Sequence, residues 1–268
     1  MSELPGNTSE DEVVFFVHVM KTGGTSVKRG LPDGYASGSR FPEPRSDNAI
    51  KFKGSTEHFF GMSAERRAAT RWVSGHLPLS AALKFREEET RPVSIISLLR
   101  DGSERAVSHL RQVARRFDYK YSYRELLNLP LLGDYFFSNH QTRALGIGEP
   151  GWEEWDRCFH AMITLESLLE AAERSLSITS VSEVDLQRAV SALSQINVLG
   201  LQHDFDNWWQ RCSDRYDWPS TPPPPANVGA DRESTNAPPI PENILGELRE
   251  RNELDCRLYA AAQNSLRQ

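Results

Sequence analysis

The sequence lacks the features that mark membrane, disulfide-bonded and nucleic-acid-binding proteins. Its three cysteines, Cys158, Cys212 and Cys256, are far apart and include no C-x-x-C pair, which argues against a disulfide framework or a cysteine zinc site. No apolar run approaches the ~18 residues of a membrane span. Residues 1–12 are polar and acidic, unlike a signal peptide. The scattered cysteines suit a reducing compartment, so we expect a cytoplasmic protein. The net charge of −6 leaves no excess of cations for a phosphate backbone, so we expect no nucleic-acid partner.

The composition that remains is typical of a globular protein. The chain has 268 residues, of which 38% are hydrophobic and 25% are charged. We expect a flexible tail over residues 1–12 and one domain over 13–268, with a proline-rich loop at 219–241 before the C-terminal helix. This loop holds eight of the sixteen prolines. Composition alone favours a passive linker there over an ordered loop that covers a site.

The hydrophobic pattern predicts an α/β fold. Two nearly unbroken apolar runs, Val13–Val19 and Val93–Leu99, are typical of strands buried on both faces. Weaker strand candidates are Arg71–Ser74, Ala161–Leu165 and Val198–Leu201. Apolar residues at helical spacing follow Ser103, a good N-cap, and predict a helix there. The same spacing recurs over Gln187–Leu193 and Asn243–Leu266. Residues 31–60 are expected to be loop. This alternation predicts a central, mostly parallel sheet flanked by helices.

The first strand is followed by a phosphate-binding pattern, Met20-Lys-Thr-Gly-Gly-Thr-Ser26, directly before a predicted helix. Two adjacent glycines permit a tight turn that aims backbone N–H groups at one point. Lys21 and three hydroxyl groups complete a cradle for a phosphate or a similar anion. The order differs from a Walker A loop, in which the lysine follows the second glycine. The alternative is a glycine-rich turn with incidental hydroxyls.

The second strand is followed by a cationic segment that begins at Arg100. Arg100 stands at the carboxyl end of its strand, where open α/β sheets bind ligands, and a guanidinium can fork onto a phosphate. Ser108 lies one helical turn beyond Arg105, so we expect both on the face opposite the apolar stripe, with Arg111 and Arg115 extending it. The alternative is a surface helix with solvated charges.

Both segments resemble sulfotransferases that use 3′-phosphoadenosine-5′-phosphosulfate (PAPS), most of all carbohydrate sulfotransferases such as the heparan sulfate 2-O and 6-O enzymes. His18-Val-Met-Lys-Thr-Gly-Gly-Thr-Ser26 resembles their 5′-phosphosulfate loop, with Met20 in place of proline. Leu99–Leu110 resembles their 3′-phosphate motif, Arg-Asp-Pro-x-x-Arg-x-x-Ser, with Gly102 in place of proline. Further resemblances follow in the same order at Asn139–Gly146, Val198–Asp206, Pro225–Arg232 and Asn252–Tyr259.

The resemblance implies a P-loop-like three-layer fold and a PAPS-dependent sulfotransferase. The PAPS-binding residues that it implies are Lys21, Thr22, Gly23, Gly24, Thr25, Ser26, Arg100, Ser108, Asn227 and Arg232. It would also make the proline-rich stretch an ordered lid. Asn139, Gln141 and Arg143 would either hold the acceptor or brace the PAPS loop. In-line transfer to a hydroxyl needs no metal, and we expect none.

A base must take the proton of the acceptor hydroxyl, and His76 is the candidate. It lies in Ser74-Gly-His-Leu-Pro78, which resembles the Gly-His motif that carries the base in heparan sulfate 2-O-sulfotransferase. The alternative is a histidine that only caps a turn. Lys21 would stabilise the leaving phosphate. Glu166 is the rival base, and His18 is interpreted as a structural residue within the strand. His109, His140 and His203 are weaker candidates.

The acceptor is expected to be a hydroxyl of a glycan, a glycolipid or a small natural product, because the net charge argues against a polysulfated polymer. Golgi relatives carry a membrane anchor, and this chain, which starts at Met1, shows none, so a bacterial enzyme is expected. One rival function is a kinase-type phosphotransferase, disfavoured because Gly-Lys-[Ser/Thr] is missing. The other is a non-catalytic nucleotide-binding protein. The departures from the resembled family at Met20, Gly102 and His203, which stands where Glu is common, give it weight.

Overall fold

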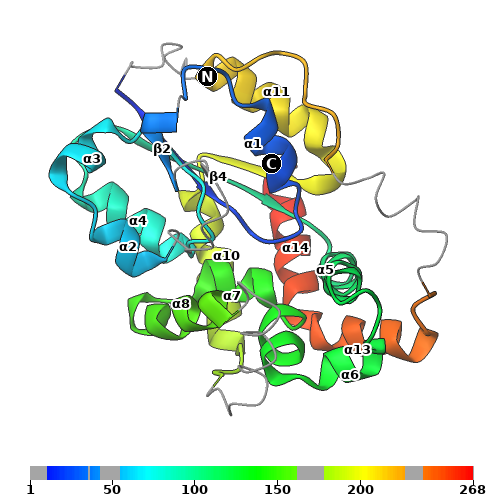
Figure 1. Cartoon of the computed structure of the whole chain (residues 1–268). Helices are drawn as coiled ribbons and strands as arrows, with labels where there is room; N and C mark the ends of the chain where they lie inside the picture. Colours follow the sequence, from blue (N-terminus) through cyan, green and yellow to red (C-terminus); the bar gives the residue numbers. More distant parts are fainter. Residues whose placement is uncertain (1–10, 36, 43–54, 162–177, 227–237, 268) are drawn as a thin grey trace.

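A five-stranded parallel sheet forms the centre of the molecule (Figure 1). The computed structural model describes residues 11–35, 37–42, 55–161, 178–226 and 238–267. In sheet order the strands are β2 (Arg40–Phe41), β3 (Trp72–Val73), β1 (Val13–Val17), β4 (Val93–Leu99) and β5 (Val198–Leu201). All four pairings are parallel. The prediction of an α/β fold with a mostly parallel sheet is therefore confirmed.

The two apolar runs of the sequence form the two longest strands. β1 pairs with β4 from Val13 opposite Val93 to Val17 opposite Ser97, and every residue of both strands is buried. The strand predictions at 71–74 and 198–201 are also confirmed, as β3 and β5. The prediction at 161–165 is wrong at its first residue, because Ala161 ends the helix α8. Its other residues lie outside the described ones.

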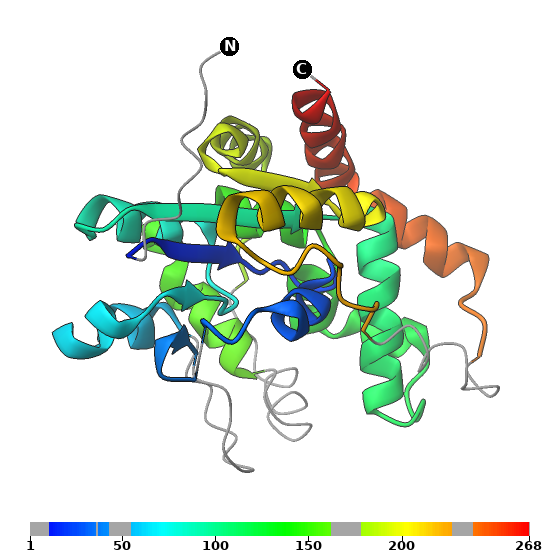
Figure 2. The ribbon, with the colours of Figure 1, turned by 90° about the horizontal axis from the view of Figure 1, so that it is seen from above.

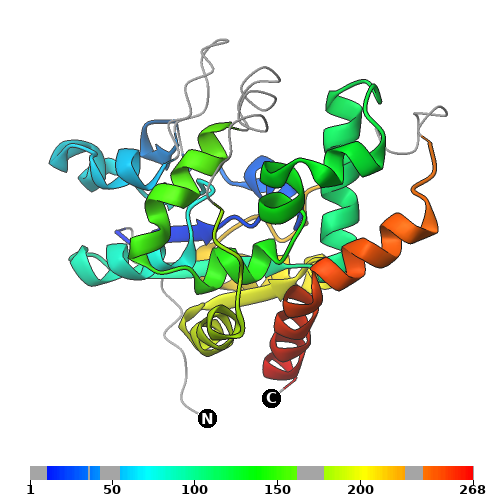
Figure 3. The same ribbon diagram turned by 90° about the horizontal axis from the view of Figure 1, so that it is seen from below.

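Helices cover both faces of the sheet and give three layers. Along β1, Val14 and Phe16 face α1 (Gly24–Gly30) and α11 (Phe205–Tyr216), which lie in front of the strands in Figure 2. The alternate residues of β1 face the larger core, and Figure 3 views the molecule from the face on which this core lies. The helices of this second layer are α4 (Leu79–Glu88), α7 (His140–Gly146), α8 (Trp152–Ala161) and α10 (Glu183–Ala192).

The other elements lie around these layers. They are α2 (Thr56–Phe60), α3 (Ala64–Ala69), α5 (Gly102–Arg116), α6 (Tyr123–Asn128), α13 (Glu242–Arg251) and α14 (Glu253–Leu266), with the short helical segments η1 (Ser37–Ser39), η2 (Leu131–Phe136), η3 (Glu149–Gly151), η4 (Leu193–Gln195) and η5 (Gln202–Asp204). None of the helices in these ranges is long and apolar enough to cross a bilayer.

Three predictions about helices and loops need correction. The N-cap of α5 is Asp101, not Ser103, because the Asp101 carboxylate accepts from the Glu104 N–H at 3.0 Å and from the Ser103 hydroxyl at 2.6 Å. The predicted stretch Asn243–Leu266 is two helices, α13 and α14. They break at buried Asn252, whose side-chain amide donates to the carbonyl of Phe137. Residues 31–60 also contain η1, β2 and α2.

The strand order places several loops side by side at one edge of the sheet. From β1 the chain builds β2 and β3 on one side, then crosses to β4 and β5 on the other. The order of strands therefore reverses at β1, and ligands of open α/β sheets bind outside the carboxyl ends at such a point. The segments that follow β3, β1 and β4 are neighbours at this edge, and they carry His76, Lys21 and Arg100.

Candidate functional site

The loop between β1 and α1 turns sharply at two residues in the left-handed region, Lys21 (φ 70°) and Gly23 (φ 106°). Thr22 is buried, and its hydroxyl donates to the carbonyl of Val19 at 2.9 Å, so this hydroxyl shapes the loop from within. The N–H groups of Gly24 and Thr25 begin α1 and find no acceptor among the described residues. They are thus available to an anion, and Thr25 is exposed.

The second glycine of the loop is required by a close approach. A Cβ on Gly24 would lie 2.0 Å from Nε2 of His18, so no other residue fits without displacing that ring. At Gly23 the backbone conformation requires glycine, because residues with a side chain rarely adopt its positive φ. The pair therefore seats the start of α1 directly against the histidine that follows β1.

The first half of the proline-rich loop lies against α1. The N–H of Ala226 donates to the hydroxyl of Ser26 at 2.8 Å, and Pro223 lies beside Gly30. Residues 219–226 therefore contact α1, whereas the alternative of an ordered loop that covers a site stays a prediction. The predicted contacts Asn227 and Arg232 lie outside the described residues, as does the rival base Glu166.

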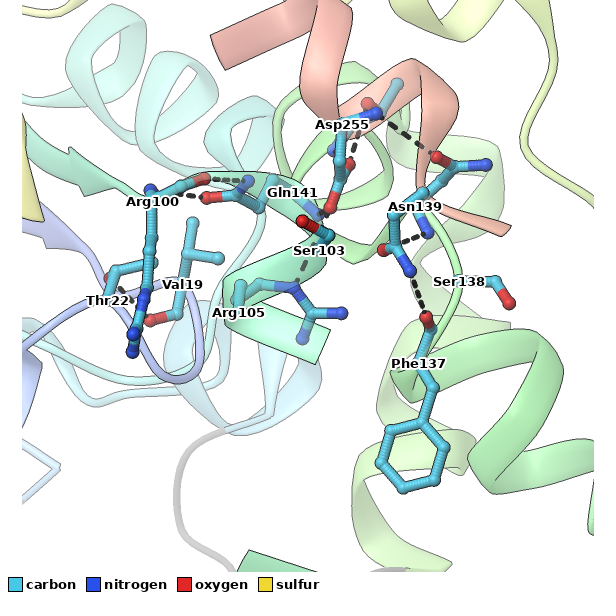
Figure 4. Close-up of polar contacts among 12 residues, drawn as sticks. Val19, Thr22, Arg100, Ser103, Arg105, Phe137, Ser138, Asn139, Gln141 and Asp255 are labelled. Carbon is cyan, nitrogen blue, oxygen red and sulfur yellow. Dashed lines mark hydrogen bonds and ion pairs between the residues drawn. The ribbon is translucent and has the colours of Figure 1, made fainter. Parts of the chain in front are cut away.

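Arg100 projects from the carboxyl end of β4, and its backbone is held by Gln141. The Gln141 side chain accepts from the Arg100 N–H at 2.9 Å and donates to the Arg100 carbonyl at 2.6 Å, and it is fully buried. The guanidinium pairs at 3.2 Å with Glu104, which is 62% exposed. Figure 4 shows the Arg100 side chain extending on the side of Val19 and Thr22. Of the two roles considered for Gln141, its hydrogen bonds match the bracing one.

Arg105 has a different environment from the one predicted. It is fully buried and lies 3.7 Å from the carboxylate of Asp255 in α14 (Figure 4). It also donates to the carbonyl of Phe136 at 2.9 Å. Burial lowers the pKa of Arg105 to about 10, although Asp255 acts in the opposite direction. The predicted cationic face shared with Ser108 is therefore wrong at Arg105. Ser108 itself is half-buried, and Arg111 is exposed.

Asp255 joins the last helix to the site. It accepts from the N–H groups of Gln141 and Thr142 at 3.0 and 2.7 Å. Its own N–H donates to the Asn139 side chain at 3.1 Å. A Cβ on Gly102 would lie 2.6 Å from the Asp255 Cβ, so glycine stands where the resembled motif has proline because α14 approaches α5 closely there.

The third residue of this predicted group, Arg143, is also buried. Its guanidinium lies over the Tyr135 ring, 4.5 Å from the centroid, and donates to the Thr179 carbonyl at 2.6 Å. Asn139 adopts a left-handed conformation, and its N–H donates to Asn252 at 3.0 Å. Asn139, Gln141 and Arg143 thus make hydrogen bonds within the protein, and their roles toward an acceptor or the PAPS loop stay predictions.

His76 follows β3 and stacks on His18, with ring centroids 4.3 Å apart. Its Nδ1 lies 3.0 Å from the carbonyl oxygen of His18, which can only accept, so Nδ1 carries the proton and Nε2 the lone pair. Phe159 stacks on the His76 ring at 5.3 Å, and Trp155 donates to the His76 carbonyl at 2.7 Å. The ring is therefore held in the tautomer that a base requires.

Burial keeps both stacked histidines neutral. It lowers the pKa of His76 to about 4, with a further contribution from the charge of Lys28 and an opposing one from the bond to His18. The pKa of His18 falls well below its usual value through burial, then through His76 and Lys28. At neutral pH both rings are therefore unprotonated, and with this lowered pKa His76 is a weaker base than a free imidazole.

The sequence did not reveal the roles of His18 and Lys28. His18 lies just beyond β1 and not within it, and it is the partner that orients His76. Lys28 lies four residues after Gly24 in α1. Residues at this helical spacing share a face, and this was the sequence signal that could have placed Lys28 on the same side of the helix as Gly24. His109 and His140 are buried, and His203 shares a hydrogen bond with the Tyr259 hydroxyl at 2.6 Å.

The ranges that the structure describes hold no group of three or more His, Cys, Asp or Glu side chains that could bind a metal ion. A pocket of about 830 Å³ lies elsewhere, between α2, α4 and α8, and none of the predicted site residues lines it. In comparisons with known proteins, no family model and no curated protein matches the chain. The function of the chain is therefore inferred from its motifs and from their geometry.

Proposed function

We propose that this chain is a PAPS-dependent sulfotransferase that transfers a sulfuryl group to a hydroxyl of a glycan, a glycolipid or a small natural product. The observation that carries the proposal is the arrangement of three groups, the Lys21 loop, Arg100 and His76, which follow three adjacent parallel strands where the strand order reverses. The strand order and this loop also support a P-loop-like fold. A bacterial, cytoplasmic location stays a prediction.

The residues of the loop fit the doubly charged end of the co-substrate. Lys21 and the N–H groups of Gly24 and Thr25 would hold the 5′-phosphosulfate. Arg100 and Ser108 would hold the 3′-phosphate, because Arg100 projects from the neighbouring strand and its side chain remains 26% exposed. Ser26 and Thr22 act on the protein itself through their hydroxyls, and Asn227 and Arg232 stay predictions.

The same residues account for in-line transfer. PAPS, when bound, supplies the sulfuryl group on a good leaving phosphate. His76 takes the proton of the acceptor hydroxyl at Nε2 while that oxygen forms its bond to sulfur and the bond from sulfur to the phosphate oxygen breaks. Lys21 stabilises the negative charge that gathers on the departing phosphate.

The proposal is tested by thermal unfolding with adenosine-3′,5′-bisphosphate, AMP and ATP. A ligand that binds only the folded state stabilises it by about 2.7 kcal/mol at a hundredfold excess over Kd. We expect the bisphosphate to stabilise the wild type most and Arg100→Ala to lose this preference. Arg111→Ala, which changes an exposed arginine of α5, is expected to keep it.

Two outcomes would overturn the proposal. A preference for ATP, or no response to any of the three nucleotides, would exclude a PAPS site, and the ATP result would favour the kinase-type phosphotransferase. Binding of the bisphosphate without transfer of radiolabelled sulfate to any of a panel of hydroxyl acceptors would indicate a nucleotide-binding protein without catalysis.

A further inference from the structure

A second lysine lies beside the base. Lys28 and Gly24 are separated by one helical turn of α1 and share a face, and Gly24 is the residue that touches the His18 ring. Side chains on a helix lean toward its N-terminus, so the Lys28 side chain leans toward the stacked pair of His18 and His76. Its charge lowers the pKa of both histidines.

Lys28 is a half-buried cation whose ammonium group has no counter-ion among the described residues. Within the part of the chain that the structure describes, no carboxylate pairs with it and no group accepts a hydrogen bond from it. Burial alone lowers its pKa, to about 8, and so it is still mostly charged at neutral pH. An ammonium group removed from water is unfavourable unless it gains an anionic partner, so its position favours the binding of an anion there.

The two lysines act on different parts of the site. Lys28 acts electrostatically on His18 and His76, whereas the charge of Lys21 lowers the pKa of His109, on α5. In an in-line transfer the sulfuryl group lies between the acceptor hydroxyl, next to the base, and the leaving phosphate. The cation whose charge acts on the base would therefore lie next to the sulfuryl oxygens.

We propose that Lys28 binds the sulfuryl group during its transfer, while Lys21 binds the phosphate that leaves. This inference rests on the proposed function. It gives Lys28 two effects, since its charge stabilises the sulfuryl oxygens and also disfavours a proton on His76 before the acceptor arrives. Other titratable groups near His76 are His18 after β1 and, farther along, His109 of α5 and His140 of α7.

The test compares a ligand with the sulfuryl group and one without it. Calorimetry gives the affinities of PAPS and of adenosine-3′,5′-bisphosphate for the wild type, Lys28→Met, Lys21→Met and Arg29→Met, an exposed cation of the same helix. Hydrogen bonds to charged groups are worth about 1.5–3 kcal/mol. We expect Lys28→Met to lower the affinity for PAPS about 10-fold or more and the affinity for the bisphosphate by less than about twofold. Lys21→Met weakens both ligands, and Arg29→Met neither.

Outcomes for this inference and for the proposed function are separable. If the wild type binds neither ligand, the proposed function fails. If it binds both and Lys28→Met weakens them equally or not at all, Lys28 does not bind the sulfuryl group and this inference is wrong. Lys28→Arg keeps the charge and is expected to recover PAPS affinity. A histidine titration followed by NMR adds a second readout, in which Lys28→Met raises the pKa of His76.

Discussion

The two halves of the candidate site hold charge in opposite ways. On the side of β4 and α5, Arg105 pairs with buried Asp255 and Arg100 pairs with Glu104. On the side of β1 and β3, two neutral histidines stack on one another, and Lys28 has no counter-ion within the described residues. Both halves lie at the same edge of the sheet, and both follow central strands.

This difference separates a cation that is enclosed in the fold from cations that stay partly exposed. Arg105 is enclosed with its carboxylate, so it fixes α5 against α14 and cannot reach a ligand. Arg100 has a surface partner that solvent weakens, so it can exchange Glu104 for a phosphate at little cost. Two arginines of one motif, five residues apart, therefore have different tasks.

The largest expected effect comes from breaking the buried pair. Arg105→Met leaves the Asp255 carboxylate without its cation, and removal of one partner of a buried pair costs about 3–5 kcal/mol. We expect a loss of this size in the free energy of unfolding, measured with urea, whereas Arg100→Ala changes it by less than about 1 kcal/mol.

The double variant Arg105→Met with Asp255→Asn provides the control. Because it removes the unpaired charge, it is expected to be less destabilised than the sum of the single variants. An unfolding free energy within about 1 kcal/mol of wild type for Arg105→Met would show that the pair does not hold these helices.

The four buried histidines predict a loss of stability in acid. Burial lowers the pKa of His18, His76, His109 and His140, so the unfolded chain takes up their protons first as the pH falls. Their contribution is complete above about pH 6.5, the usual histidine pKa, and is lost as the pH falls through it toward the folded values, about 4 for His76. Each histidine contributes a slope of up to about 1.4 kcal/mol per pH unit.

Urea unfolding between pH 7 and pH 4.5 measures this slope. His109→Asn is expected to reduce it by the share of one histidine, because asparagine does not titrate. A slope that is unchanged in His109→Asn, or a stability independent of pH over this range, would contradict neutral burial of these rings.

A smaller effect is expected from the residue that braces Arg100. Gln141→Leu removes both hydrogen bonds to the Arg100 backbone and leaves buried polar groups unpaired, which costs about 1–3 kcal/mol. The preference for adenosine-3′,5′-bisphosphate over AMP is expected to fall along with stability, as Arg100 loses its position. A stable variant that keeps the full preference would show that the brace does not serve the phosphate site.

The smallest effect is expected from the exposed ion pair between Arg100 and Glu104. Glu104→Gln frees the guanidinium of Arg100 from an exposed ion pair, which is worth about 0–1 kcal/mol. We expect stability within about 0.5 kcal/mol of wild type and bisphosphate affinity equal or up to about fivefold higher. Calorimetric titration checks this, and a weaker affinity would mean that Glu104 orients Arg100 for its ligand.

The strands were predictable because local sequence determines them. Val13–Val17 and Val93–Leu99 are apolar on both faces, and a parallel sheet between helix layers is the structure that buries such runs. The pair of adjacent glycines also predicted the position of the loop between β1 and α1. The strands and this loop depend on residues that are neighbours in the sequence, so the sequence alone is enough to predict them.

The site was less predictable because its partners come from distant segments. Helical spacing placed Arg105 on a polar face, but α14 covers that face and brings Asp255 from 150 positions farther along the chain. The break at Asn252 depends on the Phe137 carbonyl, and the tautomer of His76 depends on the backbone of His18. No local pattern encodes such contacts.

Hydrogen exchange with and without adenosine-3′,5′-bisphosphate shows where on the chain the ligand binds. We expect new protection in peptides that cover residues 18–26 and 99–109, with little change in those that cover the pocket near Phe60 and Trp152. Protection confined to that pocket, or absent from the segments after β1 and β4, would contradict a co-substrate site at this edge of the sheet.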